Sequence, residues 1–410
     1  MKGWKTDLND TRITIGIMGG LVSNENMGCV ALTYSLLAML NRISNRIKCD
    51  FDYIIFEYDQ DYRENKFDEL RQYFKLSRNQ IQYAPIGYYD LNNPKLFLKK
   101  ARINFKTLHD IKRCDVVIDI TQGDSFSDIY GEERFFRLSN IKYVAEILQI
   151  PFILGPQTYG PFMKRKVERF ARKIINKANL VVSRDTKSAM YLKELCDKDI
   201  YVGTDLAFGL PYNDEYATSG KLKVGINPSG LLCNKKNEKT DLNTALSADY
   251  DQYVLELINC LKERNFDIYL IPHVGEDGVN SFSEIEGVNT HPEFSNPIEA
   301  KSFISSMDIF IGARMHATIA AFSSGVATIP TAYSRKFAGL YETLDYKYVV
   351  DLTRDNTSEV LQQTMRYVDA YLELKKSSKY SMQKVKKIYD AMEDKIQKEI
   401  EKIVNNRRSK

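Results

Sequence analysis

The chain has 410 residues, of which 43% are apolar and 27% are charged. This composition is typical of a folded globular protein, and the length predicts more than one hydrophobic core. The formal net charge is +4, yet residues 371–410 alone hold 12 Lys/Arg against 6 Asp/Glu. The rest of the chain is therefore close to neutral, which argues against a nucleic-acid-binding core.

Cysteine and histidine usage narrows the class of protein further. Six cysteines are scattered without a CxxC pair, which predicts reduced thiols in a cytoplasmic protein. With four histidines and no HExxH motif, we expect no metal site and no metal cofactor. The polar N-terminus predicts no signal peptide, and no apolar run appears long enough to span a bilayer.

Strand and helix patterns alternate from the start of the chain, which predicts α/β units around a mainly parallel sheet. The Tyr- and Lys-rich region 60–112 is ambiguous, and we expect helices there with a loop around 92–94. Outside this region, the first α/β series is predicted to have strands at 13–18, 53–57, 115–120, 151–155 and 180–183. Its helices are predicted at 29–40, 137–149, 164–177 and 186–195.

A polar, turn-rich segment at 212–221 interrupts this series and is the best candidate for a linker. A second α/β series follows, with strands at 223–227, 268–272, 309–311 and 326–329. We therefore predict two Rossmann-like domains that face a cleft, an N-terminal one over residues 1–212 and a C-terminal one over residues 221–375.

Residues 376–410 are expected to form a basic, amphipathic C-terminal helix. Apolar side chains recur there at steps of three and four, which places them on one stripe: Met382, Val385, Ile388 or Tyr389, Met392, Ile396, Ile400 and Ile403. The stripe is typical of a helix packed along the protein body. An alternative is peripheral contact between the basic face and an anionic membrane.

Polar clusters follow the predicted strands of the first series, where ligands collect in parallel sheets. Asn26 lies in the loop GGLVSNENMG and can bond a hydroxyl or cap the next helix. Asp124 and Ser125 lie in TQGDSFSD, where Asp124 can act as a base or cap a turn. Gln157 lies in GPQTYGPF. Each of these side chains has a functional and a purely structural interpretation.

Cationic side chains follow strands in both series. Arg184 comes directly after the strand at 180–183, and Arg314 and His316 follow the strand at 309–311 at the start of a helix. Helix N-termini and arginines both favour anions, and histidine titrates near neutral pH. Lys336 in AYSRKFAGL can reach the same anion, whereas for His273 in LIPHV we favour a structural role.

Taken together and in this order, the segments resemble the polysaccharide pyruvyl transferase family over residues 24 to about 340. The matching segments are NENMGCVAL, VVIDITQGDSFSDIYG, GPQTYGPF, VVSRD, IPHV and IGARMHATIAAFSSGVATIPTAYSRKFAGL. One departure is Cys29, where many members carry an acidic residue. The resemblance implies a fold similar to that of the GT-B glycosyltransferases. It also implies transfer of a pyruvyl group from phosphoenolpyruvate to a sugar of a cell-surface polysaccharide or its precursor, with a ketal as product.

The resemblance links Arg184, Arg314 and His316 to the phosphoenolpyruvate site, and we add Lys336. His316 is the expected general acid and Asp124 the expected base, while Asn26, Asp124, Ser125 and Gln157 are expected to contact the acceptor, which is either free or lipid-linked. Two alternatives stay open: a GT-B glycosyltransferase that uses a nucleotide sugar, and a non-catalytic glycan-binding protein of the same fold.

Overall fold

The computed structural model describes residues 12–87, 95, 99–214, 220–233, 246–275 and 277–408, except for the side chains at 335, 336, 338, 407 and 408. Contacts divide the chain into two compact units. Unit 1 contains Met1–Asn24, Leu32–Leu206 and Ile388–Lys410, and unit 2 contains Glu25–Ala31 and Ala207–Lys387. The predicted domain boundaries stay a prediction, and the predicted linker includes residues 215–219, which lie outside the described residues.

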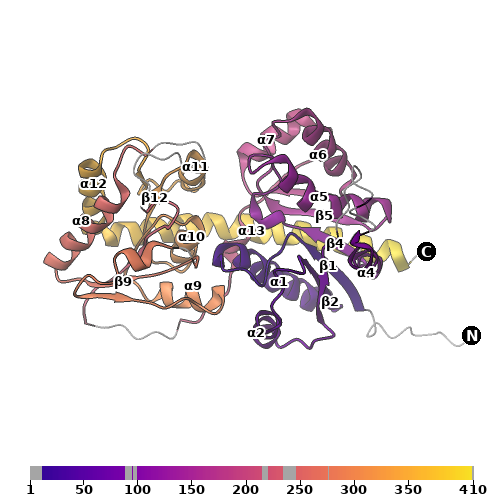
Figure 1. The fold of residues 1–410 in the computed structure, drawn as a ribbon, viewed down its shortest axis with the longest axis horizontal. Coiled ribbons are helices and arrows are strands. Elements are labelled where there is room, and N and C mark those ends of the chain that lie inside the picture. Colours follow the sequence, from indigo (N-terminus) through magenta and orange to yellow (C-terminus); the bar gives the residue numbers. More distant parts are fainter. Residues whose placement is uncertain are drawn as a thin grey trace, which may run out of the picture. The chain divides into compact units, whose positions relative to one another are not determined.

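Unit 1 is built on a parallel seven-stranded sheet in the order β3-β2-β1-β4-β5-β6-β7 (Figure 1). The order reverses direction between β1 and β4, and the loops after these two strands therefore flank the switch point where ligands bind in open parallel sheets. The strands are β1 (Arg12–Met18), β2 (Asp50–Glu57), β3 (Ile81–Pro85), β4 (Val116–Asp119), β5 (Phe152–Gln157), β6 (Leu180–Ser183) and β7 (Tyr201–Val202).

Helices connect these strands and bury their apolar sides against the sheet. One hydrophobic cluster gathers side chains of the helices after β3, β4, β5 and β6. The described helices are α1 (Met27–Ile47), α2 (Glu64–Phe74), α4 (Ala101–Lys112), α5 (Glu132–Ile147), α6 (Arg165–Lys177) and α7 (Thr186–Leu195). The ambiguous region 60–112 thus contains a strand as well as helices; its expected loop at 92–94 lies outside the described residues.

Unit 2 contains a parallel six-stranded sheet in the order β10-β9-β8-β11-β12-β13, with its switch point between β8 and β11. Its strands are β8 (Lys223–Asn227), β9 (Asp267–Leu270), β10 (Val288–Thr290), β11 (Ile309–Gly312), β12 (Ala327–Ala332) and β13 (Val350–Asp351). Its helices are α8 (Tyr250–Glu263), α9 (Pro297–Ser305), α10 (Met315–Ser323), α11 (Arg335–Thr343) and α12 (Thr357–Asp369).

The chain ends in one long helix, α13 (Tyr371–Arg408), which Figure 1 shows as uninterrupted. It begins earlier than the predicted tail helix. The predicted apolar stripe is buried at Met392, Ile396, Ile400 and Ile403. Within unit 1, Glu393 accepts hydrogen bonds from Arg42 and Arg46 of α1 at 2.6 Å each. The stripe therefore packs against protein, as expected of a helix on the protein body.

Helix α1 corrects one expectation about membrane spans. Met27–Ile47 is long and apolar enough to cross a bilayer. However, 78% of its most apolar stretch is buried in the protein, as is usual for the core helix of a folded domain. The sequence pattern understated its length because Asn41 and Arg42 interrupt the apolar run.

Candidate functional site

In unit 1, three predicted loops meet around Arg184. The guanidinium donates through Nη1 to Asp205 Oδ2 at 2.6 Å and through Nε to Thr158 Oγ1 at 2.9 Å. A Cβ atom on Gly123 would lie 3.0 Å from Nη1, so a residue without a side chain is needed at this position. The loops after β4, β5 and β6 thus converge on one buried arginine, whose side chain is 6% exposed.

Asp124 and Ser125 lie in the loop after β4, at the switch point of the unit 1 sheet. Asp124 Oδ2 accepts a hydrogen bond from the Tyr130 hydroxyl at 3.1 Å. Ser125 is buried, and its Oγ accepts a hydrogen bond from Arg134 Nη2 at 3.2 Å. Arg134 also lies over the Tyr130 ring, 5.5 Å from its centroid. Tyr130 and Arg134 therefore hold the side chains of Asp124 and Ser125, which the sequence predicted to contact the acceptor.

Gln157 ends β5 as a fully buried residue. Its Nε2 donates to the Asp119 backbone oxygen at 3.2 Å and to Asp119 Oδ2 at 3.1 Å. Asp119 also pairs with the buried Lys142, Nζ to Oδ1 at 3.0 Å. Burial lowers the pKa of Lys142, and the Asp119 carboxylate opposes that shift. The structure thus places the Gln157 amide in a buried network beneath the loop after β4.

In unit 2, Arg314 follows β11 and is held by Asp277. Arg314 Nε donates to Asp277 Oδ1 at 2.7 Å, and the Asp277 side chain is fully buried. Asp277 Oδ2 also accepts from Asn227 Nδ2 at 3.0 Å and from the backbone N–H groups of His273 and Val274 at 2.8 and 3.0 Å. One carboxylate therefore joins the loops that follow β8, β9 and β11.

His316 lies in the first turn of α10, against the start of α1. A Cβ atom on Gly28 would lie 2.4 Å from His316 Nδ1, so any side chain at position 28 would displace the imidazole. Asn26 Oδ1 caps α1 by accepting from the Gly28 N–H at 3.0 Å, and the Met27 N–H donates to the His273 backbone oxygen at 3.1 Å. Asn26, which the sequence predicted to contact the acceptor, therefore lies in unit 2 together with His316.

His273 is buried beside these two residues. Burial, with further contributions from His316 and then Arg314, lowers the pKa of His273 to about 3. The imidazole is therefore neutral at physiological pH. The sequence favoured a structural role for His273, and the structure bonds its backbone to Asp277 and Met27.

The two arginines differ in the helix that follows each of them. The N-terminus of α7 is capped by Asp185, whose Oδ1 accepts from the Ser188 N–H at 2.7 Å. The N-cap of α10 is Arg314 itself, and its side chain makes no capping hydrogen bond. The first turn of α10 therefore combines a helix N-terminus with a guanidinium and an imidazole, an arrangement suited to an anion.

Lys336 lies in the first turn of α11, the helix after β12, but its side chain lies outside the described residues. Within the described part of the chain, no three His, Cys, Asp or Glu side chains gather closely enough to hold a metal ion.

Sequence reasoning missed the two aspartates that hold the arginines. Asp205 lies in VGTDLAFG after β7, and Asp277 lies in HVGEDG after β9. Both follow strand ends, which was an available signal. Their arginine partners are 21 and 37 residues away in the chain, and no spacing rule connects them.

Comparison with solved structures identifies the fold. A putative UDP-N-acetylglucosamine 2-epimerase from Listeria monocytogenes aligns with a TM-score of 0.56 and 13% identity, covering 90% of this chain and 91% of its own. A UDP-N-acetylglucosamine 2-epimerase from Methanocaldococcus jannaschii aligns with a TM-score of 0.54 and 10% identity, over 87% and 92%. Arabidopsis thaliana UGT89C1 in complex with UDP aligns with a TM-score of 0.55 and 9% identity, over 95% and 99%.

Two parallel sheets of this kind, with a long C-terminal helix, define a GT-B-like fold. The family model for polysaccharide pyruvyl transferase matches residues 26–335, which is most of the chain. The chain therefore belongs to the polysaccharide pyruvyl transferase family. A search of curated proteins finds no match.

Proposed function

We propose that this protein transfers the pyruvyl group of phosphoenolpyruvate to a sugar of a cell-surface polysaccharide or its precursor, and forms a ketal. Family membership supports the reaction class. The observation that carries the proposal is the first turn of α10, where Arg314 stands at the N-cap and the His316 imidazole packs against Gly28.

Phosphoenolpyruvate carries a carboxylate and a phosphate, and the α10 N-terminus offers two kinds of anion stabilisation. The backbone N–H groups and the helix dipole attract negative charge, and the guanidinium adds charge-assisted hydrogen bonds. Asp277 fixes the orientation of Arg314 through Nε at 2.7 Å. A preoriented cation of this kind stabilises developing negative charge on a departing phosphate without reorganisation.

In the proposed reaction, His316 donates a proton to the methylene carbon of phosphoenolpyruvate. This generates an oxocarbenium-like centre, which a sugar hydroxyl attacks as it loses its proton to a base. Phosphate then leaves with the C–O bonding electrons, and a second hydroxyl of the same sugar attacks, loses its proton to the neutral imidazole of His316 and closes the ketal. One phosphate is released per ketal, and imidazole suits the first step because it is the side chain most often used as a general acid.

Asp124 is the proposed base for the attacking hydroxyl, with Ser125 as its neighbour in the same loop. Its position at the unit 1 switch point and its bond from Tyr130 support this role. Asn26 and Gln157 already bond to the α1 backbone and to Asp119. Their predicted acceptor contacts, like the phosphoenolpyruvate contacts of Arg184 and Lys336, stay predictions.

We propose a cytoplasmic location for this reaction, which six cysteines without a disulfide support. Membrane contact through the basic face of α13 stays a prediction.

The decisive experiment measures phosphate release from phosphoenolpyruvate across a panel of sugar acceptors, with mass spectrometry of the products. Gly28→Ala is the sharpest variant because its Cβ would lie 2.4 Å from His316 Nδ1. Gly220→Ala is its matched control, since a Cβ there meets nothing within 4 Å. We expect Gly28→Ala to depress kcat while the control stays at the wild-type rate. Equal rates for the two variants would contradict the role of His316.

A nucleotide-sugar glycosyltransferase is the second candidate, because a structural neighbour of this fold is complexed with UDP. Calorimetric titration with UDP, GDP and phosphoenolpyruvate separates the two candidates. Tight UDP or GDP binding without any response to phosphoenolpyruvate would replace the pyruvyl proposal.

A further inference from the structure

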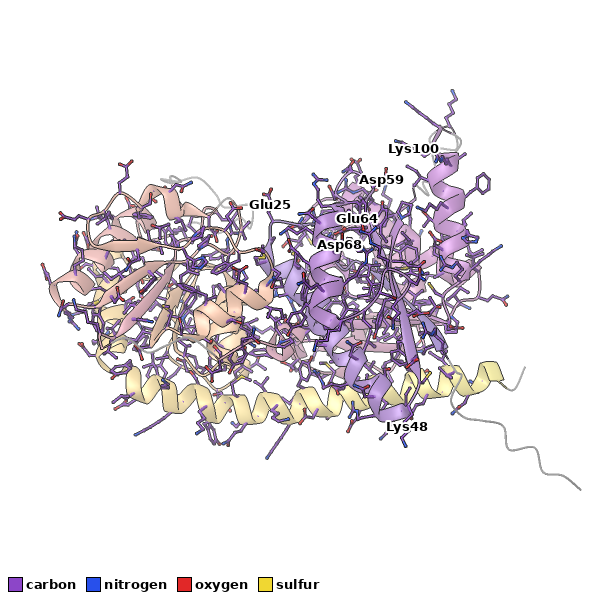
Figure 2. The ribbon with its side chains drawn as sticks, turned by 90° about the horizontal axis from the view of Figure 1, so that it is seen from below. Glu25, Lys48, Asp59, Glu64, Asp68 and Lys100 are labelled. Carbon is purple, nitrogen blue, oxygen red and sulfur yellow. The ribbon has the colours of Figure 1, made fainter. Side chains whose placement is uncertain are left out.

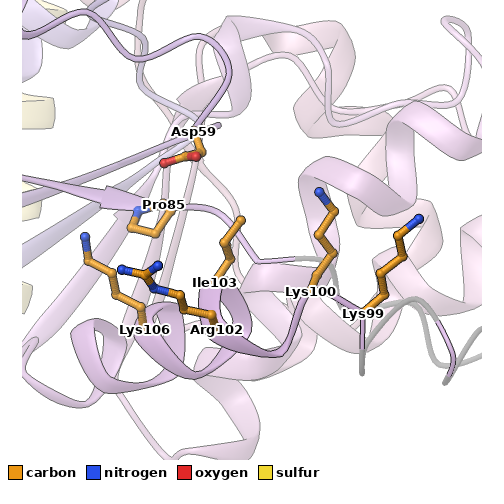
Figure 3. A pocket seen from close by; sticks show the side chains of 7 residues that line it. All are labelled: Asp59, Pro85, Lys99, Lys100, Arg102, Ile103 and Lys106. Carbon is orange, nitrogen blue, oxygen red and sulfur yellow. The ribbon is translucent and has the colours of Figure 1, made fainter.

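Unit 1 contains an open, basic hollow that the candidate site does not use. Its volume is about 500 Å³, which is within the range of small-ligand sites. Figure 3 shows Arg102 and Lys106 extending from α4, and Asp59 from the loop after β2. The lining includes four cations, Lys99, Lys100, Arg102 and Lys106, against the single carboxylate of Asp59. Figure 2 labels Asp59 and Lys100 on the surface of this unit.

The fold builds this hollow at the ligand-binding edge of the sheet. Asp59 follows the end of β2, and Pro85 is the last residue of β3. The Thr107 hydroxyl donates to the Pro85 backbone oxygen at 2.7 Å and ties α4 to that strand end. Arg102 and Lys106 are four residues apart on α4 and therefore extend from the same face of the helix. Helix α4 also begins here, at Ala101.

The Asp59 carboxylate in the hollow is bonded to a tyrosine. Asp59 Oδ1 accepts a hydrogen bond from the Tyr83 hydroxyl at 3.0 Å. Lys106 Nζ lies 5.7 Å from the centroid of the Tyr83 ring. Two acidic side chains of α2, Glu64 and Asp68, are bonded to arginines of their own. Neither Arg102 nor Lys106 forms an ion pair within the described part of the chain.

The like charges of Arg102 and Lys106, side by side on α4, repel one another and cost stability. A bound anion removes that cost, and a phosphate or diphosphate matches the site best because its several oxygens can bond several cations at once. The volume is larger than a single phosphate requires, so it leaves room for an attached group. The hollow therefore fits the anionic end of a larger molecule.

Its place in the sheet relates it to the acceptor. Helix α4 is tied to the end of β3, and strands β3 and β4 are three positions apart in the order β3-β2-β1-β4. With about 4.8 Å between strands, their carboxyl ends lie on the order of 15 Å from each other. A phosphate group with a short chain of sugar rings spans such a distance. A phosphate held in the hollow would thus leave a sugar hydroxyl at the loop after β4, which contains Asp124.

We infer that this hollow binds the phosphate or diphosphate group of the sugar acceptor, and that Arg102 and Lys106 contact its oxygens. The inference rests on the proposed pyruvyl transfer for the identity of the ligand as acceptor. The phosphate comes either from a free sugar phosphate or from a lipid-linked sugar diphosphate.

The test is calorimetric binding of inorganic pyrophosphate to the full chain in the presence of saturating phosphoenolpyruvate. Arg102→Gln/Lys106→Gln is compared with Lys112→Gln/Lys177→Gln, which removes two exposed cations of unit 1 that do not line the hollow. We expect the first pair to weaken pyrophosphate binding at least about tenfold, with phosphoenolpyruvate affinity unchanged. The control pair is expected to bind as the wild type does. Equal weakening in both pairs, or no pyrophosphate binding to the wild type, would overturn the inference.

Competition then separates the two sources of phosphate. N-acetylglucosamine 1-phosphate and a decyl diphosphate derivative of the same sugar are each titrated against bound pyrophosphate. Displacement by both compounds means that the hollow binds the phosphate of a sugar whether or not a lipid is attached. Displacement by the decyl compound alone means that the acceptor is lipid-linked. If neither displaces pyrophosphate, the ligand is not a sugar phosphate and the inference fails. Failure of the pyruvyl proposal is distinguishable, because phosphoenolpyruvate would then show neither binding nor phosphate release.

Discussion

Arg184 in unit 1 and Arg314 in unit 2 occupy equivalent places, each at the carboxyl end of a buried strand and before a helix. Each is bonded to a buried aspartate, at 2.6 Å in unit 1 and 2.7 Å in unit 2. They differ in the helix that follows. Asp185 caps α7, whereas the side chain at the N-cap of α10 makes no cap. The same strand–arginine–helix pattern thus favours an anionic ligand in unit 2 more than in unit 1.

The largest expected difference between the two units is the loss of stability when the aspartate that holds each arginine is removed. Asp277 accepts hydrogen bonds from Arg314, Asn227 and two backbone N–H groups. Removing one partner of a buried ion pair leaves an uncompensated charge. We expect Asp277→Ala to lower the free energy of unfolding by about 4 kcal/mol, and Asp205→Ala by about 3 kcal/mol. Urea denaturation followed by circular dichroism measures both. An equal or larger loss in Asp205→Ala would break the comparison.

His316 has no counterpart after Arg184, where Thr186 occupies the equivalent position. We expect His316→Ala to lower kcat for phosphate release by at least about a hundredfold, because a general acid contributes at least that much. The KM for phosphoenolpyruvate should stay close to the wild-type value. Full kcat with a raised KM would instead assign His316 to substrate binding.

The arginines themselves test whether both contact the donor. We expect Arg184→Ala and Arg314→Ala each to raise the KM for phosphoenolpyruvate, by about 2 kcal/mol or roughly thirtyfold. Steady-state kinetics with varied donor measures this, and circular dichroism confirms that the variants fold. An effect of Arg184→Ala on the acceptor KM alone would show that only the arginine of unit 2 contacts phosphoenolpyruvate.

The stability of unit 2 should depend on pH through His273. The pKa of His273 is lowered to about 3 by burial, and further by His316 and Arg314, so below about pH 6.5 the unfolded state binds a proton that the folded state does not. Stability is therefore present above pH 6.5 and is lost as the pH falls toward 3. Between pH 7.5 and 5.5 we expect a loss of about 1 kcal/mol. The same loss in His273→Gln would assign the effect to another group.

Local patterns predicted much of this fold because buried parallel strands are nearly continuous apolar runs. The bounds of β6 and β8 match the expected ranges. Helix α2 lies in the region 60–112, where helices were expected, whereas strand β3 was not predicted because this Tyr- and Lys-rich region shows no clear strand period. The residue types at the strand ends pointed to Arg314 and His316, whereas Asp277 and the Gly28–His316 contact depend on tertiary folding and on segments distant in the chain.

Asp277 also has a consequence for dynamics. Because its carboxylate accepts the backbone N–H groups of His273 and Val274, those amides should exchange with solvent only when unit 2 opens cooperatively. Asn227, His273, Val274 and Arg314 are then held in place before a ligand arrives. A ligand that binds beside them loses its own freedom but orders little protein, so association should be fast and should change few amide exchange rates at these residues.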